Sequence, residues 1–243
     1  MALDLQTTVG EWVKERPARC RVFEQLQIDY CCGGAETLAV ACSKRGLDPQ
    51  TVLQQIQQSD SQSALGDEDL ADAGAMSLTE LADHIEQVHH TYLKAELPRL
   101  DAMTKKVLEV HGESDPRLAD VRRAFVGLHQ ELSSHLMKEE QILFPMIRQL
   151  ESSSHVPAFH CGSVANPIRQ MEYEHDSAGK ALAVMRASTD DYRPPEWACN
   201  TYRAMLDGLK QLEWDLHQHI HKENNVLFPK AIRREADLAA GQG

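Results

Sequence analysis

An eleven-residue motif occurs twice in this chain, and the repeat limits the fold more than any other feature of the sequence. Its first copy, HLMKEEQILFP at 135–145, matches HIHKENNVLFP at 219–229 with a constant offset of 84 residues. His90 and His175 are separated by almost the same distance along the chain. A duplicated helical hairpin explains both offsets, so the sequence predicts an antiparallel four-helix bundle.

Helix-start signals define the remaining elements. Thr8 and Ser77 each precede a glutamate by three residues, which is the pattern of a capping box. Asp48, Asp115 and Asn166 each stand before a proline and are predicted N-caps. No stretch shows strand alternation, so the predicted fold class is all-α. We expect short helices near 8–15, 18–27, 35–45 and 49–58, and long helices near 78–110, 116–150, 167–187 and 195–232.

Charge and composition exclude several classes of protein. The 243 residues include 25 Lys and Arg against 37 Asp and Glu, a net charge of −12, whereas a nucleic-acid-binding protein needs a basic face. The amino-terminal segment lacks the apolar core of a secretory signal, and no run approaches the roughly 20 apolar residues of a membrane span. The six cysteines, two of them adjacent, do not resemble a disulfide framework in a chain this long. We therefore expect a cytoplasmic protein that binds neither nucleic acid nor membranes.

Much of the acidity lies in one short segment. Residues 59–76 contain five acidic side chains and no basic one, with few large apolar residues, which is typical of a solvated linker. This composition predicts a small helical N-terminal domain at 1–58, an acidic linker at 59–76 and the four-helix bundle at 77–238.

Histidine and glutamate occupy helix faces that are otherwise apolar. In the second long helix, spacings of three and four residues define one stripe of Phe125, Leu128, Leu132, His135, Glu139, Ile142 and Met146. His219 and Glu223 in the fourth helix, and His175 in the third, lie in similar stripes without lysine or arginine. A buried carboxylate with no cation costs on the order of several kcal/mol. Solvated i,i+4 contacts explain one such pair more readily than two, so the pattern predicts a metal site inside the bundle.

The other histidines are less clearly placed by the pattern. On the first long helix the repeat offset favours His90, whereas Leu81 and Ile85 continue the face of His89, so both remain candidates. The helical spacing turns four histidines away from the ligand face, namely His84, His129, His217 and His221. The loop at 151–166 contains His155, His160 and Cys161, for which metal binding is an alternative to a structural role.

Four imidazoles and two carboxylates suit two metal ions, each held by two histidines, with both glutamates bridging. Mixed nitrogen and oxygen donors favour iron over manganese or zinc. Even with an added oxo or hydroxo bridge, six side chains leave open coordination positions. The site is therefore expected to bind a small molecule or to release its metal.

Several segments carry a family resemblance, and they are DYCCGG at 29–34, SSHLMKEEQILFP at 133–145, MEYEHDSAG at 171–179 and HIHKENNVLFP at 219–229. Together they resemble the iron–sulfur cluster repair di-iron proteins, the RIC or ScdA/YtfE-like family. The resemblance covers nearly the whole chain and implies a hemerythrin-like bundle preceded by a small ScdA-type domain. It also implies iron ligands at His90, His135, Glu139, His175, His219 and Glu223, and a functional cysteine pair at Cys31 and Cys32.

The resemblance further implies a cytoplasmic protein that restores iron–sulfur clusters damaged by nitric oxide or oxidants. Its partners would be the damaged iron–sulfur proteins, and its cofactor two non-haem iron ions from which iron is donated. We expect Cys31 and Cys32 to receive or gate this iron, and the two glycines after them to give their loop backbone freedom. The remaining cysteines are expected to be ordinary small hydrophobic residues, namely Cys20, Cys42, Cys161 and Cys199.

Two other functions remain open at this point. One is a module that binds nitric oxide or dioxygen at the di-iron site. The other is an enzyme, either a nitric oxide reductase or a peroxidase-like protein. The cysteine pair favours the repair factor over a gas-binding module, because a pure gas-binding bundle has no need of it. A factor that donates iron is also expected more than a turnover enzyme. Fold alone does not separate these functions.

Overall fold

The computed structural model describes residues 3–62 and 73–241, and every regular element in these ranges is a helix. The only β-type contacts in the same ranges are isolated bridges, between Thr8 and Thr37 and between Phe159 and Gly162. The all-α fold class is therefore confirmed for the described residues. None of their helices combines the length and the apolar character that crossing a bilayer requires.

Short helices make up the N-terminal part of the chain. They are α1 (Val9–Glu15), the 3-10 turn η1 (Pro17–Arg19), α2 (Cys20–Gln25), α3 (Leu38–Arg45) and α4 (Pro49–Gln62). Thr8 caps α1 by accepting a hydrogen bond from the backbone N–H of Glu11, and Asp48 caps α4 in the same way, both as predicted. α4 continues past the predicted helix end at residue 58, and residues 63–72 of the predicted linker lie outside the described residues.

Long helices follow, and three of the four contain a π turn. They are α5 (Leu78–Ile85) with η2 (Glu86–His90) and α6 (Thr91–His111); α7 (Leu118–Lys138) with η3 (Glu139–Leu143) and α8 (Phe144–Ser152); α9 (Ala165–Ser188); and α10 (Asn200–Lys222) with η4 (Glu223–Leu227) and α11 (Phe228–Ala240). Ser77 and Glu80 form the predicted capping box, each side chain accepting from the other residue's backbone N–H. The four predicted long helices are thus confirmed, apart from details at their ends.

Three helix starts differ from the prediction. α7 begins at Leu118 with Arg117 at the N-cap, so Asp115 is not its N-cap and accepts instead from the backbone N–H of Arg117 at 3.3 Å. α9 begins at Ala165, so Asn166 lies inside the helix, where its side chain donates to the carbonyl of Cys161 and caps nothing. α10 begins at Asn200 and not near 195. The guanidinium of Arg203 donates to the carbonyls of Pro195, Glu196 and Ala198, and these bonds stabilise a non-helical path before the helix.

The chain divides into two compact units, residues 1–81 with 217–243 and residues 82–216. The first unit joins the short helices to the last turns of α10, to η4 and to α11. Its hydrogen bonds include one from Gln218 to Tyr30 and one from Asn225 to Cys31. The predicted domain limits, 1–58 and 77–238, stay a prediction.

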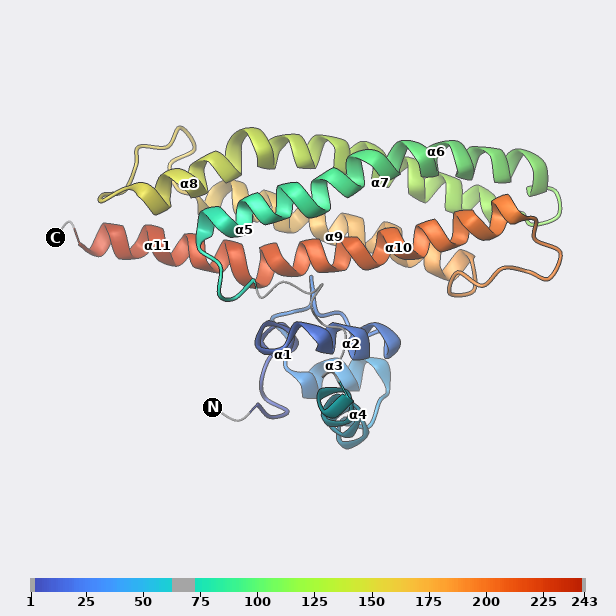
Figure 1. The fold of residues 1–243 in the computed structure, drawn as a ribbon, viewed down its shortest axis with the longest axis horizontal. Coiled ribbons are helices and arrows are strands. Elements are labelled where there is room, and N and C mark those ends of the chain that lie inside the picture. The colour runs from blue at the N-terminus through green and yellow to red at the C-terminus, as the bar shows by residue number, and fades with distance from the viewer. Residues whose placement is uncertain (1–2, 63–72, 242–243) are drawn as a thin grey trace. The chain divides into compact units, whose positions relative to one another are not determined.

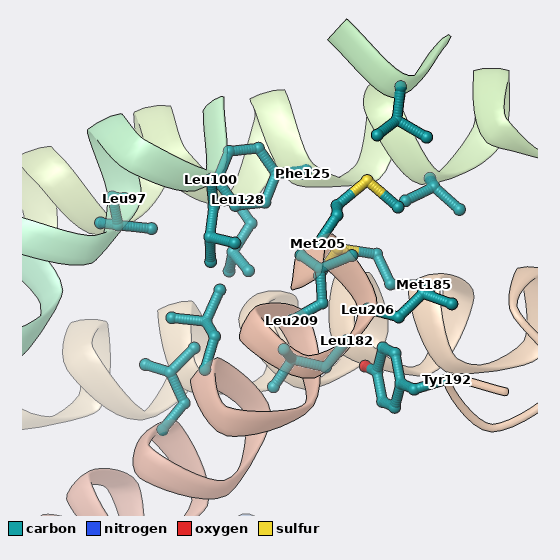
Figure 2. Packing of buried hydrophobic residues seen from close by; sticks show 14 of the residues in the cluster. Leu97, Leu100, Phe125, Leu128, Leu182, Met185, Tyr192, Met205, Leu206 and Leu209 are labelled. Atoms are coloured by element: carbon teal, nitrogen blue, oxygen red, sulfur yellow. The ribbon is translucent and has the colours of Figure 1, made fainter. Parts of the chain in front are cut away.

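The second unit contains the core of the bundle. α6, α7 and α9 run side by side (Figure 1), and residues 200–216 of α10 contribute to the same apolar cluster. Figure 2 shows side chains from these helices pointing toward one another, among them Leu100, Phe125, Leu182 and Leu209, all fully buried. Interiors of this kind are close-packed, so the core holds each helix at a defined rotation. That rotation determines which polar side chains face inward.

Candidate metal centre

Four of the predicted ligands lie in the second unit, on three helices. His90 ends the π turn η2, His135 lies near the end of α7, Glu139 opens η3 and His175 lies in the middle of α9. Each of these side chains is at most 2 % exposed. The apolar stripes therefore direct polar groups into the bundle interior, as the periodicity predicts.

The inner nitrogens of these histidines converge on one carboxylate. Glu139 Oε2 lies 3.4 Å from His90 Nε2, and Glu139 Oε1 lies 3.2 Å from His135 Nε2. His175 Nε2 lies 3.1 Å from His135 Nε2. The two oxygens of Glu139 thus face two different histidines, which is the geometry that a carboxylate shared by two cations requires.

The second copy of the repeat presents a matching pair. His219 Nε2 lies 3.1 Å from Glu223 Oε1, one helical turn away, and both side chains are at most 1 % exposed. His219 lies in the last turn of α10, and Glu223 opens η4 as Glu139 opens η3. The repeat seen in the sequence is therefore a repeat of local structure as well.

Two overlapping groups of side chains have the proximity that a metal ion needs. Within each group the ligand atoms lie within 4.8 Å of one another: His90, Glu139, His219 and Glu223 in one, and His135, Glu139, His175 and Glu223 in the other. Both glutamates belong to both groups. Buried imidazole nitrogens and carboxylate oxygens are donors that suit iron, so the residues present fit a metal of this class.

The π turns η3 and η4 have a cause in the sequence that follows them. Phe144 and Phe228 each donate their backbone N–H five residues back, to the carbonyls of Glu139 and Glu223. A proline follows each phenylalanine, and its missing N–H and its ring both disfavour the normal α-helical bond at this place. The widened turn takes up the defect, and such turns are frequent at functional sites.

The π turn also corrects one detail of the predicted stripe. Ile142 is 51 % exposed, whereas Leu143 is fully buried. The predicted inward position of Ile142 is therefore wrong, because the extra residue in η3 rotates the helix beyond Glu139.

The outer nitrogen of His90 is held by a carboxylate that the sequence reasoning missed. His90 Nδ1 lies 2.8 Å from Glu140 Oε1, and Lys94 Nζ donates to both oxygens of Glu140 at 2.6 and 2.8 Å. Burial raises the pKa of Glu140, but the bonds to Lys94 and His90 outweigh it and leave that pKa below its usual range. An ionised carboxylate at Nδ1 fixes the ring with its Nε2 facing inward.

His135 has an equivalent partner. Its Nδ1 lies 2.8 Å from Glu174 Oε2, while Lys138 and Gln170 donate to the other oxygen of this carboxylate. The hydrogen bond to His135, opposed by burial and aided by Lys138, lowers the pKa of Glu174 to about 2. Glu140 directly follows a predicted ligand and Glu174 directly precedes one. This adjacency in the sequence could have identified both glutamates as residues of the site.

The remaining histidines take other roles. His89 is buried, but its Nδ1 lies 2.9 Å from Asp215 Oδ1, and His90 is the member of the pair that joins a ligand group. His155 and His160 are exposed, and neither metal-binding group among the described residues includes them. Cys161 lies in the same loop with its sulfur 3.8 Å from that of Met146. His217 is partly buried with its Nδ1 2.5 Å from Glu24 Oε1, and His221 is 5 % exposed beside Tyr30.

Cys31 and Cys32 lie in the first unit, in the loop between α2 and α3. Cys31 is buried, its backbone N–H and its thiol both face Asp29 Oδ1, at 3.0 and 3.3 Å, and Cys32 is partly buried. The hydrogen bond with Cys32 and burial together raise the pKa of the Cys31 thiol well above its usual range. Cys31 is therefore held as a protonated thiol.

The glycines after the cysteines do not provide the backbone freedom that was expected. Among the described glycines, only Gly46 and Gly162 adopt a positive φ. A Cβ at Gly33 would lie 3.0 Å from the carbonyl oxygen of Asp29 and 3.2 Å from its carboxylate. Gly33 thus makes room for Asp29, and the reason for glycine is steric.

The other four cysteines do not behave alike. Cys20 and Cys42 are buried, as expected for small hydrophobic residues, and Cys161 is partly buried. Cys199 is exposed, so the expectation is wrong for this residue, and its sulfur lies 3.2 Å from His111 Nε2. The backbone N–H of Tyr202 and the His111 ring lower the pKa of Cys199.

Comparison with known proteins agrees with this geometry. The family described as the Hemerythrin HHE cation binding domain matches residues 80–231, and ScdA_N, a domain of unknown function (DUF542), matches residues 5–60. The iron–sulfur cluster repair proteins YtfE of Citrobacter koseri and of Escherichia coli O157:H7 are each 38% identical to the chain over 228 residues, which cover 93% of this chain and 97% of theirs. The chain therefore belongs to the hemerythrin-type family that includes the YtfE iron–sulfur cluster repair proteins, as its motifs predicted.

Proposed function

We propose that this protein repairs damaged iron–sulfur clusters by donating iron, and that Cys31 and Cys32 take part in the transfer. Its relatives are named for cluster repair, and they match the chain over nearly its whole length. The proposed ligands are His90, His135, Glu139, His175, His219 and Glu223, with both glutamates bridging two iron ions.

The observation that carries the proposal is the contact between the cysteine loop and the second ligand-bearing π turn. Asn225 donates a hydrogen bond to the carbonyl of Cys31 at 3.0 Å, and Asn225 lies two residues after Glu223 in η4. A module that only bound a gas would not need a cysteine loop attached to the turn that carries a metal ligand.

The surrounding side chains have defined tasks in this scheme. Iron held by these residues would supply redox activity and would be the cargo that the protein donates. Glu140 and Glu174 hold the rings of His90 and His135 through their outer nitrogens. A thiol must lose its proton before its sulfur binds a metal, and Asp29 Oδ1 is the acceptor that the Cys31 thiol already faces.

The proposal also covers where the protein acts and what its partners are. We place the activity in the cytoplasm, where reducing conditions keep thiols free, because all six cysteines are free in the structure. The partners would be proteins whose iron–sulfur clusters have been damaged by nitric oxide or oxidants.

A reconstituted repair assay tests the proposal. An iron–sulfur dehydratase inactivated with nitric oxide is incubated with the iron-loaded protein, and the recovery of dehydratase activity is measured. Wild type and the matched control Cys199→Ser should restore activity, and Cys31→Ser/Cys32→Ser should not. Equal repair by the double variant would contradict the role of the cysteines.

The same preparation distinguishes the competing functions. Exposure of the diferrous protein to nitric oxide, with analysis of the gas phase, separates them by stoichiometry. Catalytic formation of nitrous oxide without repair would identify an enzyme. Uptake of about one nitric oxide per iron, again without repair, would identify a binding protein.

A further inference from the structure

The side chain of Asn225 connects η4 to the cysteine loop through several contacts. Its Nδ2 donates to the carbonyl of Cys31 at 3.0 Å and to that of Tyr30 at 3.3 Å. The same Nδ2 lies 3.3 Å from His221 Nδ1. One amide therefore binds two successive carbonyls of the loop immediately before Cys32.

Two glycines form the space that this amide occupies. A Cβ added at Gly10 would lie 2.5 Å from Asn225 Oδ1, and one added at Gly34 would lie closer still. The backbone N–H of Gly10 also donates to the carbonyl of Gly34 at 2.9 Å, which joins α1 to the cysteine loop beside the amide. Any larger residue at Gly34 would displace Asn225. Glycine is therefore needed here because the Asn225 side chain approaches the backbone closely, and not because of a turn.

The other side of the loop is anchored by Tyr30. This residue is fully buried, and its hydroxyl donates to Glu24 Oε1 and accepts from Gln218 Nε2. His221 Nδ1 lies 3.2 Å from the Tyr30 carbonyl, and the His221 ring is itself buried. Tyr30 thus fixes one end of the segment while Asn225 holds its carbonyls.

From these contacts we propose that Asn225 is a positioning residue that holds the Cys31–Cys32 loop on the π turn beginning at Glu223. This inference rests on the proposed function in one respect, which is that Cys31 and Cys32 are the residues that need to be positioned. A rearrangement of η4 is transmitted to the loop, because Glu223 and Asn225 share this single turn. The contacts require an amide donor. Aspartate has the same size, but its carboxylate would place acceptor oxygens against the two carbonyl oxygens.

Cysteine alkylation measures the positioning without any repair assay. Full-length wild type, Asn225→Asp and Asn225→Ala are treated with iodoacetamide at neutral pH, and labelling of each cysteine is followed by mass spectrometry. Cys31 is 5 % exposed in the wild-type structure. In both variants it should react at least tenfold faster than in wild type. Asn224→Ala, at the neighbouring asparagine of the same turn, is the matched control and should leave the Cys31 rate unchanged.

Buried thiols elsewhere in the first unit show whether the effect is local. Cys20 and Cys42 should keep their wild-type rates in both Asn225 variants. Equal acceleration of all three buried cysteines would indicate general loosening and would overturn the proposal, as would an unchanged Cys31 rate. If Asn225→Ala does not fold, Asn225→Asp, which keeps the size of the side chain, decides the question. Altered alkylation with intact cluster repair would refute the role of the cysteines in iron transfer and leave the positioning role of Asn225 standing.

Discussion

His135 Nδ1 lies 2.8 Å from Oε2 of Glu174, so the ring of this histidine is held from the side opposite to the ligand groups. Glu140 holds His90 in the same way, and a lysine is bound to each carboxylate. Two inward-facing histidines therefore depend on residues that do not belong to either ligand group. Partners of this kind set the tautomer and raise the basicity of the metal-binding nitrogen.

Glu174→Ala and Glu140→Ala are each expected to weaken iron binding by about 10- to 100-fold, because the ring loses its orienting acceptor. Competition with a chelator of known affinity measures the change. The matched control is Glu172→Ala, at an exposed glutamate of the same helix, which should bind iron as wild type does. Wild-type affinity in both orienting variants would show that the histidine rings need no outer partner.

Asp115 should contribute to the free energy of unfolding of the bundle, and this contribution should be lost in acid. This buried carboxylate accepts from the guanidinium of Arg117 at 2.9 and 3.0 Å and from the hydroxyl of Tyr202 at 3.0 Å. Arg117 lowers the pKa of Asp115 below its ordinary value of 3.8. Asp115→Asn should therefore reduce the free energy of unfolding by about 1–3 kcal/mol at neutral pH.

The sign of the pH dependence follows from linkage. Because the folded-state pKa of Asp115 lies below the unfolded one, its ionised form stabilises the fold fully above pH 4 or so and progressively less as the pH falls. Urea unfolding of the metal-free proteins should therefore show wild type and Asp115→Asn converging at acid pH. A difference that grew on acidification would contradict this assignment.

Cys199 is expected to be the most reactive thiol at neutral pH. It is exposed at the start of α10, and the backbone N–H of Tyr202 and the ring of His111 lower its pKa. His111→Ala should slow its alkylation by roughly two- to fivefold, since the thiolate fraction falls when the pKa returns toward its usual value. Mass spectrometry of labelled peptides gives the rate, and an unchanged rate in His111→Ala would assign the reactivity to the helix start alone.

The burial of the proposed ligands could be predicted because each histidine or glutamate interrupts an apolar stripe with helical spacing. The same periodicity failed at Ile142, because a π turn inserts a residue and a regular period cannot anticipate it. His217 and His221 were correctly predicted to lie off the ligand face, but helical spacing does not show that they contact Glu24 and Tyr30. Those contacts join segments almost two hundred residues apart, and only the folded chain brings them together.

The cysteine loop shows the same limit. The motif DYCCGG marked the loop as functional, yet its glycines were expected to give the loop backbone freedom. Gly34 is instead required by a side chain from the far end of the sequence, Asn225. A local motif identifies such a glycine, whereas its cause lies in a long-range contact.

Iron content is the most direct test of the central claim, which is that Glu139 and Glu223 are shared by two iron ions. Full-length wild type, Glu139→Ala, Glu223→Ala and the control Glu172→Ala are loaded with ferrous iron, desalted and analysed for metal per chain. We predict about two irons in wild type and in the control, and clear loss of iron in both bridging variants. Full occupancy in Glu139→Ala and in Glu223→Ala would contradict the account.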